Sequence, residues 1–330
     1  MLRYTVNHWK DFGWSLLKGV VIVVVLLAVG NQLYRGWMEA SNESEHLEFR
    51  PFWLLLSGCC YMVSWLPASL WWRHVLQGLE VTPTWSDILR AYNVGHLGKY
   101  VPGKMMVPVL RSGLLQGPDM SPGKVVISVV YETISTMAVG GWVALLLFFL
   151  LDLDLDHRMI LLPLFMALAV TPVLVIPVFN HLLRWLTVSL PGEVMVIRGL
   201  NFRSVLCGFL GLAAGWGVMG LALGMTLYGV GAFGHVSFIN QLTNWPVWTF
   251  STSFAVLGGF AAIWFPAGLG VREGLLVTVL APSVGTAGAI GGAIVWRLVN
   301  VISEAVVGGG WYVLWIASKR SRSVGEERSV

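Results

Sequence analysis

Charged residues are scarce in this sequence. Asp, Glu, Lys and Arg make up 12% of its 330 residues, whereas they make up about 25% of a soluble globular domain. Hydrophobic residues make up 56%, and the mean hydropathy is +0.73. This composition excludes a soluble globular protein. Apolar runs of about 20 residues recur along the chain, each long enough to cross a hydrocarbon core about 30 Å thick. The sequence therefore predicts an integral membrane protein.

Cysteine and metal-binding motifs are also scarce. The three cysteines, Cys59, Cys60 and Cys207, lie in apolar stretches, which argues against a disulfide framework and indicates small packing residues. The seven histidines show no HExxH-type spacing, and the chain contains no P-loop. We therefore expect no metal and no cofactor.

Six uninterrupted apolar runs predict full membrane spans, at residues 16–34, 52–72, 125–151, 159–179, 205–230 and 286–316. Two further segments, 85–118 and 245–282, are interrupted by proline, glycine and charge. In the fifth span, the pairs Gly211/Gly215 and Gly220/Gly224 have the small-xxx-small spacing that is typical of close helix packing.

The distribution of charge predicts the orientation. Basic residues precede the first span and follow the fourth and the last, whereas the loops after the first and third spans are acidic. Because cytoplasmic loops carry the excess of Lys and Arg, we expect both termini in the cytoplasm, with the protein in the cytoplasmic (inner) membrane. The formal net charge of +4 then suits an anionic membrane surface better than nucleic acid.

This orientation constrains the topology. If each interrupted segment is a re-entrant hairpin, six spans return the chain to the cytoplasm, with one hairpin entering from the cytoplasm and the other from outside. The fold would be all-α and polytopic: a single transmembrane domain with inverted repeats near residues 52–151 and 205–316 and a cytoplasmic tail at 317–330. An alternative with eight full spans, in which 248–265 and 272–282 each cross, keeps the same ends.

The interrupted segments contain two helix breaks, the first at Gly98, Pro102 and Gly103 and the second at Pro266, Gly268 and Gly270. Non-helical backbone at membrane depth needs protein or water to satisfy its amides, so each break predicts a polar cavity. A charge near the bilayer centre costs about 2.5 to 3.5 kcal/mol. Several nevertheless flank the breaks, and we predict that they bind substrate: Lys99, Lys104, Arg111, Arg272 and Glu273.

An alternative without a substrate site is that the first segment is an amphipathic cytoplasmic loop whose basic residues contact lipid headgroups. His96, the histidine near the first break, is interpreted separately, as a headgroup contact or an ordinary loop residue. After each break, a short helix is expected to restart, near residues 105–115 and 271–280. Their first turns would offer unpaired amides to an anion such as phosphate. Arg111 and Arg272, in or near these turns, would add planar donors that match phosphate oxygens.

Three more charged residues, Glu132, Arg297 and Glu304, lie deep in predicted spans. Arg297 and Glu304 are seven residues apart, too far for a direct pair within one helix. We predict structural ion pairs, such as Arg111 with Glu132 or Arg272 with Glu304, or a carboxylate that takes up a proton or cation during transport. The two roles are compatible.

The motif HLGKYVPGK (residues 96–104), followed by Arg111 and by Glu132 in the next span, and the motif FPAGLGVREG (residues 265–274) resemble the lysylphosphatidylglycerol synthase transmembrane-region family. That family includes the flippase half of the bacterial multiple peptide resistance factor. Two departures are Glu132-Thr133, where the family commonly has Glu-Arg, and Pro266-Ala-Gly268, where Pro-Gly-Gly is usual. No aminoacyl-transferase domain follows residue 316, so the resemblance implies the translocation half.

The predicted function is therefore a flippase, not an enzyme, that moves an anionic, phosphate-bearing lipid, either plain or modified with an amino acid or sugar, between leaflets. The expected partner is a membrane lipid with an anionic headgroup, with a lipid-synthesis enzyme or a second copy of the chain as further partners and no nucleic acid. One alternative is a glycosyl- or headgroup transferase using a polyprenyl-phosphate donor, with Glu132, Glu273, Glu304 or the acidic turn 152–156 supplying the carboxylate. Another is an accessory scaffold for an envelope-lipid synthase.

Overall fold

The structure, a computed structural model, describes residues 49–100, 106–115, 120–151, 156–174, 176–187, 196–262 and 268–327. Every regular element in these ranges is a helix, which confirms the all-α class. Four helical stretches are long and apolar enough to cross a membrane: Pro51–Gly78, Pro122–Leu151, Phe202–Gly229 and Val271–Ala317. The chain is therefore a multi-pass membrane protein. The predicted first span, residues 16–34, lies outside the described residues.

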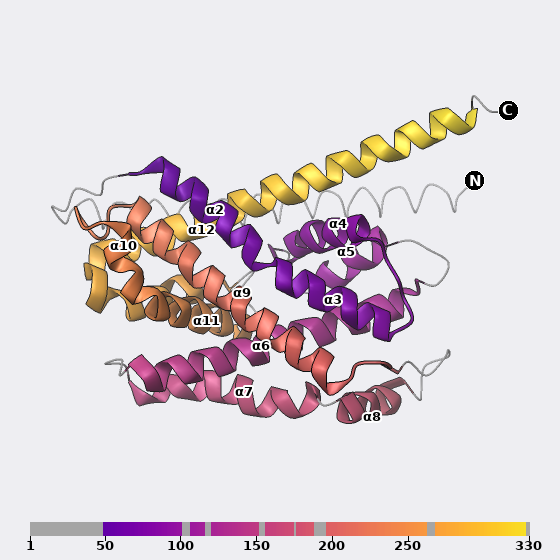
Figure 1. The fold of residues 1–330 in the computed structure, drawn as a ribbon, viewed down its shortest axis with the longest axis horizontal. Coiled ribbons are helices and arrows are strands. Elements are labelled where there is room, and N and C mark those ends of the chain that lie inside the picture. The colour runs from indigo at the N-terminus through magenta and orange to yellow at the C-terminus, as the bar shows by residue number, and fades with distance from the viewer. Residues whose placement is uncertain are drawn as a thin grey trace, which may run out of the picture.

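Helices α2 (Pro51–Ser64) and α3 (Leu66–Gly78) form the second predicted span, which is interrupted at Trp65. Pro67, at the start of α3, lacks the amide hydrogen that would continue the helical hydrogen bonding. Helix α9 (Phe202–Gly229) packs along both helices, as Figure 1 shows. At the crossing, a Cβ on Gly215 would lie 2.8 Å from the carbonyl oxygen of Ser64. The absence of a side chain at Gly215 thus permits this close approach.

Helix α6 (Pro122–Leu151) packs against α3, α7 (Leu161–Leu174) and α11 (Trp245–Ala261). The short helix η2 (His157–Ile160) leads into α7, and α8 (Ile176–Thr187) follows it. The predicted span 159–179 thus corresponds to η2, α7 and the start of α8.

The close packing predicted for the fifth span is confirmed, because a Cβ on Gly220 would lie 2.7 Å from the Cα of Thr249 in α11. One on Gly224 would meet the ring of Trp248.

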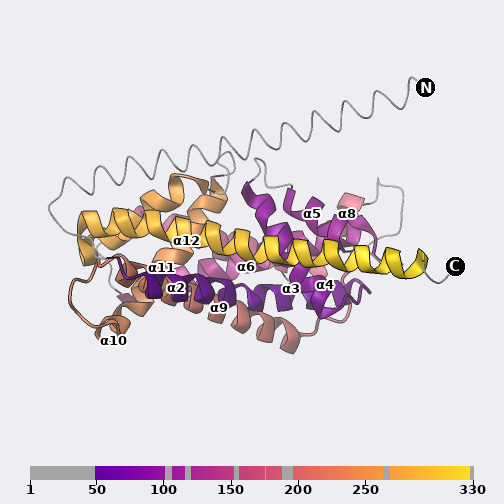
Figure 2. The ribbon, with the colours of Figure 1, turned by 90° about the horizontal axis from the view of Figure 1, so that it is seen from above.

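Each interrupted segment forms a pair of helices that contact each other. The first contains α4 (Trp85–His96), η1 (Leu97–Tyr100) and α5 (Met106–Leu114). The second contains α11 and the beginning of α12 (Val271–Glu327) and is preceded by α10 (Phe238–Gln241) and η3 (Leu242–Asn244). Figures 1 and 2 show α4 and α5 toward the end of the molecule that carries the C-terminus, and α11 toward the other end.

Helix α12 contains the boundary between the second interrupted segment, predicted to end near Pro282, and the last span, predicted to begin at residue 286. The helix continues past Pro282 and is kinked at Gly285, directly before the predicted start of the last span. Gly285 has φ 72° and ψ 163°, a conformation that is accessible in practice only to glycine, and it divides α12 into two arms. The first arm, residues 271–284, belongs to the interrupted segment, and the second continues as the last membrane-length helix.

Candidate functional site

The first helix break contacts the second arm of α12 in the interior of the bundle. Lys99 and Tyr100, at the end of η1, both reach the carboxylate of Glu304. The ring of Tyr100 also lies 5.8 Å from the guanidinium carbon of Arg297. Side chains about 200 positions apart in the sequence are thus brought together between apolar helices.

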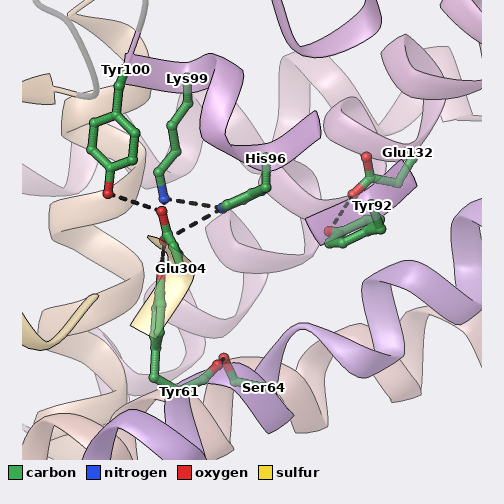
Figure 3. Close-up of polar contacts among 8 residues, drawn as sticks. All are labelled: Tyr61, Ser64, Tyr92, His96, Lys99, Tyr100, Glu132 and Glu304. Carbon is green, nitrogen blue, oxygen red and sulfur yellow. Dashed lines mark hydrogen bonds and ion pairs between the residues drawn. The ribbon is translucent and has the colours of Figure 1, made fainter. Parts of the chain in front are cut away.

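Glu304 is the centre of this cluster, and its side chain is only 2% exposed. Its Oε1 accepts hydrogen bonds from Lys99 Nζ at 2.5 Å and from the hydroxyl of Tyr61 on α2, while its Oε2 accepts one from Tyr100 Oη at 2.9 Å. Figure 3 shows these side chains pointing toward Glu304, Tyr61 from α2 and Lys99 and Tyr100 from η1. Because a buried carboxylate is tolerated only when it is paired and hydrogen-bonded, these three donors account for the charge at this depth.

His96, the last residue of α4, joins the same cluster. Its Nε2 lies 3.0 Å from Lys99 Nζ and 3.8 Å from Glu304 Oε1, the latter too long for a hydrogen bond. A lysine ammonium can only donate, so the ring nitrogen accepts the bond from Lys99. His96 is therefore an inward-facing helical residue, and its interpretation as an ordinary loop residue was wrong.

The second break is held by glycine and by Glu273. Gly268 and Gly270 have φ values of 69° and 82°, in the left-handed region that glycine adopts without strain. The amide of Gly270 donates to Glu273 Oε2 at 2.7 Å, the back-bond of a capping box, which fixes the start of α12. Glu273 Oε1 also lies 3.7 Å from Arg297 Nη1. Glu273 thus connects the break to the second arm of α12.

Arg272 occupies the first turn of α12, as predicted, but its interactions differ from the expected ones. Glu304 pairs with Lys99, so the predicted Arg272–Glu304 pair was wrong. Among the described residues Arg272 forms no ion pair, and its buried Nε has no hydrogen-bond partner. Its side chain crosses Gly259 of α11, where a Cβ would lie 2.5 Å from Arg272 Cγ. Gly259 therefore leaves room for the inward course of this arginine.

A small cavity of about 20 Å³ adjoins Arg272 and Arg297. Tyr61, Trp296 and Asn300 contribute to its wall, and the volume suffices for about one water molecule. Of the described charges in this region, Lys99, Arg272 and Arg297 are cationic and Glu273 and Glu304 are anionic. Three cations against two carboxylates leave one excess positive charge beside the cavity.

Arg111 and Glu132 form a separate buried pair, as predicted, with Arg111 Nη1 3.0 Å from Glu132 Oε2 and side chains 2% and 5% exposed. The guanidinium carbon lies 4.1 Å from the ring centroid of Tyr92 and 4.6 Å from that of Trp72, so aromatic rings cover the cation. Tyr92 Oη also donates to Glu132 at 3.2 Å. A Cβ on Gly95 would lie 2.4 Å from Arg111 Cγ, so this glycine makes room for the arginine stem.

The position of Arg111 corrects another expectation. It lies in the last turn of α5, so it cannot add donors at the start of that helix. The predicted restart after the second break is confirmed at Val271. Gly98 is buried, and a Cβ there would lie 2.8 Å from Val107 N, which explains a glycine where η1 contacts α5. Lys104, Pro102, Gly103 and Pro266 lie outside the described residues.

Three tyrosines were missed by the sequence interpretation. Tyr61, Tyr92 and Tyr100 donate hydrogen bonds to the buried carboxylates. The available signal was a hydroxyl inside or beside an apolar run, since a buried tyrosine usually needs a hydrogen-bond partner. Among the described residues, no group of three or more His, Cys, Asp or Glu side chains is placed to hold a metal ion.

Comparison with known proteins identifies the chain at the level of the family. Comparison with curated proteins gives no match. The family model described as the lysylphosphatidylglycerol synthase TM region matches residues 15–308, which include both helix breaks and every charged residue of the two buried clusters. The chain therefore belongs to the lysylphosphatidylglycerol synthase transmembrane-region family.

Proposed function

We propose that this protein is a flippase that moves a lipid with an anionic, phosphate-bearing headgroup between the leaflets of the cytoplasmic membrane. One observation carries the proposal: Lys99 and Arg272, beside the two helix breaks, meet Arg297 of the last span in the interior, and the described residues place two carboxylates, Glu273 and Glu304, with these three cations. An excess positive charge is costly between apolar helices unless an anion offsets it. The role of the family's membrane region in lipid metabolism supports a lipid as that anion.

Arg272 is the residue we assign to the phosphate. Lys99 and Arg297 have carboxylate partners, whereas Arg272 forms no ion pair among the described residues. It stands in the first turn of α12, where helix amides and the helix dipole favour negative charge. Its planar guanidinium can donate two parallel hydrogen bonds to phosphate oxygens. Lys99 and Arg297 would contribute longer-range attraction.

The proposed topology has six full spans and two re-entrant hairpins related as inverted repeats. Helices α4 and α5, with 12 and 9 residues, measure about 18 and 14 Å and are too short to cross alone. Helix α11, with 17 residues, measures about 25 Å, a few Å short of the hydrocarbon core. The positions of the two hairpins toward opposite ends of the molecule support entry from opposite sides, with both termini cytoplasmic.

We favour transport over group transfer because the interior carboxylates are already engaged. Glu132 is bonded to Arg111 and Tyr92, Glu304 to Lys99 and two tyrosines, and Glu273 to a helix start and Arg297. A catalytic base needs a free lone pair directed at the substrate. These carboxylates instead balance the cations and fix their positions.

The first test is the substitution Arg272→Ala in proteoliposomes that contain fluorescent phosphatidylglycerol. We expect movement of the lipid between leaflets to fall by at least tenfold, because the phosphate loses its principal charged donor. The readout is the rate at which a membrane-impermeant reductant quenches the inner-leaflet fluorophore.

The matched control is Arg198→Ala, since Arg198 is 75% exposed and pairs with the exposed Glu80. This variant should flip lipid at the wild-type rate. Unchanged flipping in Arg272→Ala, with normal insertion and folding, would refute the assignment of Arg272. Product formation from a polyprenyl-phosphate sugar by the purified protein alone would favour the transferase.

A further inference from the structure

A second feature lies on the membrane-facing side of the polar cluster. Helices α2 and the second arm of α12 border a groove of about 1010 Å³. Its walls include Leu55 and Met62 on α2 and Val299, Ile302 and Val306 on α12. Apart from the hydroxyl of Ser303 and the thiol of Cys59, the side chains that line it are hydrocarbon or thioether. Such a surface suits a flexible apolar chain and offers nothing to a headgroup.

The groove and the polar cluster are separated by one contact between the same two helices. On α2, Gly58 and Met62 line the groove, whereas Tyr61 lines the small cavity and donates to Glu304. On α12, Val299 and Ser303 line the groove, and Asn300 lines the cavity. A molecule held in the groove therefore lies one layer of side chains from the charged groups.

That layer is thin at its narrowest point. A Cβ on Gly58 would lie 2.5 Å from Ser303 Oγ, so the helices touch there without a side chain from α2 between them. Next to it, the hydrogen bond from Tyr61 to Glu304 closes the polar side. Among the described residues, separating α2 from α12 here breaks the hydrogen bond from Tyr61 to Glu304 and the edge-to-face contact between the rings of Tyr61 and Trp296, whereas Gly58 itself has no side chain to disengage.

From this arrangement we propose that the groove between α2 and α12 binds an acyl chain of an anionic phospholipid, whose headgroup reaches the Arg272 cluster across the Gly58–Ser303 contact. The proposal rests on the proposed function for the identity of the headgroup. The occupant is argued from the position of the groove: it is apolar, lies on a membrane-length helix, and adjoins the region with excess positive charge. A lipid is the ligand class that needs both environments at once.

The test is photo-crosslinking with phosphatidylglycerol that carries a diazirine midway along one acyl chain, in proteoliposomes, with peptide mapping by mass spectrometry. We expect adducts to concentrate on groove residues of α2 and α12. The variant Ile302→Trp fills the groove from its exposed side, since Ile302 is 58% exposed, and should lower these adducts at least threefold. The matched variant Leu146→Trp, at a position on α6 that is 61% exposed and outside the groove, should leave them unchanged.

Two results would overturn the proposal. Equal labelling of the groove and of the exposed surface of α6 would indicate ordinary surrounding lipid. Crosslinks from a photoreactive residue at position 302 to residues 16–34 of the same chain, or to a second copy, would show that protein fills the groove. Crosslinking does not depend on transport. Groove-specific adducts without any flipping would therefore uphold the acyl-chain site and refute the flippase, and the converse pattern would do the reverse.

Discussion

At the scale of single residues, the buried charged side chains differ in whether the fold gives them a partner of opposite charge. Arg111 and Glu132 satisfy each other, and Tyr92 contacts both. A pair closed in this way serves structure, because a ligand would have to displace a partner at close range. Arg272 is the contrasting case, because in the described part of the chain no carboxylate lies within ion-pair distance of it. Substitutions at the two sites should therefore separate loss of stability from loss of transport.

The first residue-scale prediction concerns the Arg111–Glu132 pair. Glu132→Gln leaves the arginine buried without an anion, and Arg111→Met leaves the carboxylate without a cation. Each variant should lower the free energy of unfolding by about 3 to 5 kcal/mol. The double variant should lose much less than the sum, since no unpaired charge remains. Unfolding by a denaturing detergent in mixed micelles measures these differences.

The control for this cycle is Arg198→Met, which removes one member of the exposed Arg198–Glu80 pair. Exposed pairs contribute about 0 to 1 kcal/mol, so this variant should unfold like the wild type. Strictly additive losses in the Arg111 and Glu132 variants would mean that the two side chains do not interact.

A second residue-scale prediction concerns Tyr61 and Tyr100, which both donate to Glu304. Tyr61→Phe removes one donor from a buried carboxylate that keeps Lys99, and should destabilise the fold by about 1 to 3 kcal/mol. Tyr100→Phe should have a loss of similar size, and thermal unfolding followed by tryptophan fluorescence measures both. If both variants unfold at the wild-type temperature, Lys99 alone satisfies the carboxylate of Glu304.

At the scale of elements, glycine sets the distance between helices. Gly220 allows α9 to approach the backbone of α11 at Thr249, whereas Gly309 on α12 has nothing within 4 Å of a built Cβ. The same change, glycine to alanine, should therefore act in opposite directions. Gly220→Ala forces the two helices apart and should cost about 1 to 3 kcal/mol. Gly309→Ala should gain up to about 1 kcal/mol through its better helix propensity.

Thermal unfolding of both variants in the same detergent decides this prediction. A neutral Gly220→Ala variant would mean that α9 and α11 can separate at little cost. Their contact would then not be a rigid part of the bundle.

At the scale of the whole molecule, the prediction concerns how the second hairpin sits in the membrane. In a background with alanine at the three native cysteines, Thr82→Cys should react with an impermeant maleimide from the cytoplasmic side and Asn240→Cys from outside. Gly274→Cys, near the start of α12, should be shielded on the cytoplasmic side, because a re-entrant hairpin does not reach that surface. Labelling of Gly274→Cys from the cytoplasm as fast as Thr82→Cys would favour eight full spans.

The sequence predicted the helices better than the contacts between them. Hydropathy located Pro122–Leu151 and Phe202–Gly229 within three residues at each end, because burial in lipid requires continuous apolar helices. The Arg111–Glu132 pair could also be anticipated, since short connections keep α4, α5 and α6 together. Glu304 could not be assigned to Lys99, because 205 positions separate them and only tertiary packing decides which cation arrives.

The glycine joint at Gly285 has a mechanical consequence. An unbroken helix transmits torque from one end to the other as a stiff rod does, but the conformation of Gly285 interrupts that transmission. Glu304 and Arg297 lie on the long rod, whose far end projects beyond the bundle in Figure 1, while Arg272 and Glu273 lie on the short one. A rotation of the projecting end would therefore move Arg297 and Glu304 but not Arg272 and Glu273. The Glu273–Arg297 ion pair joins the two arms and would be strained by that rotation.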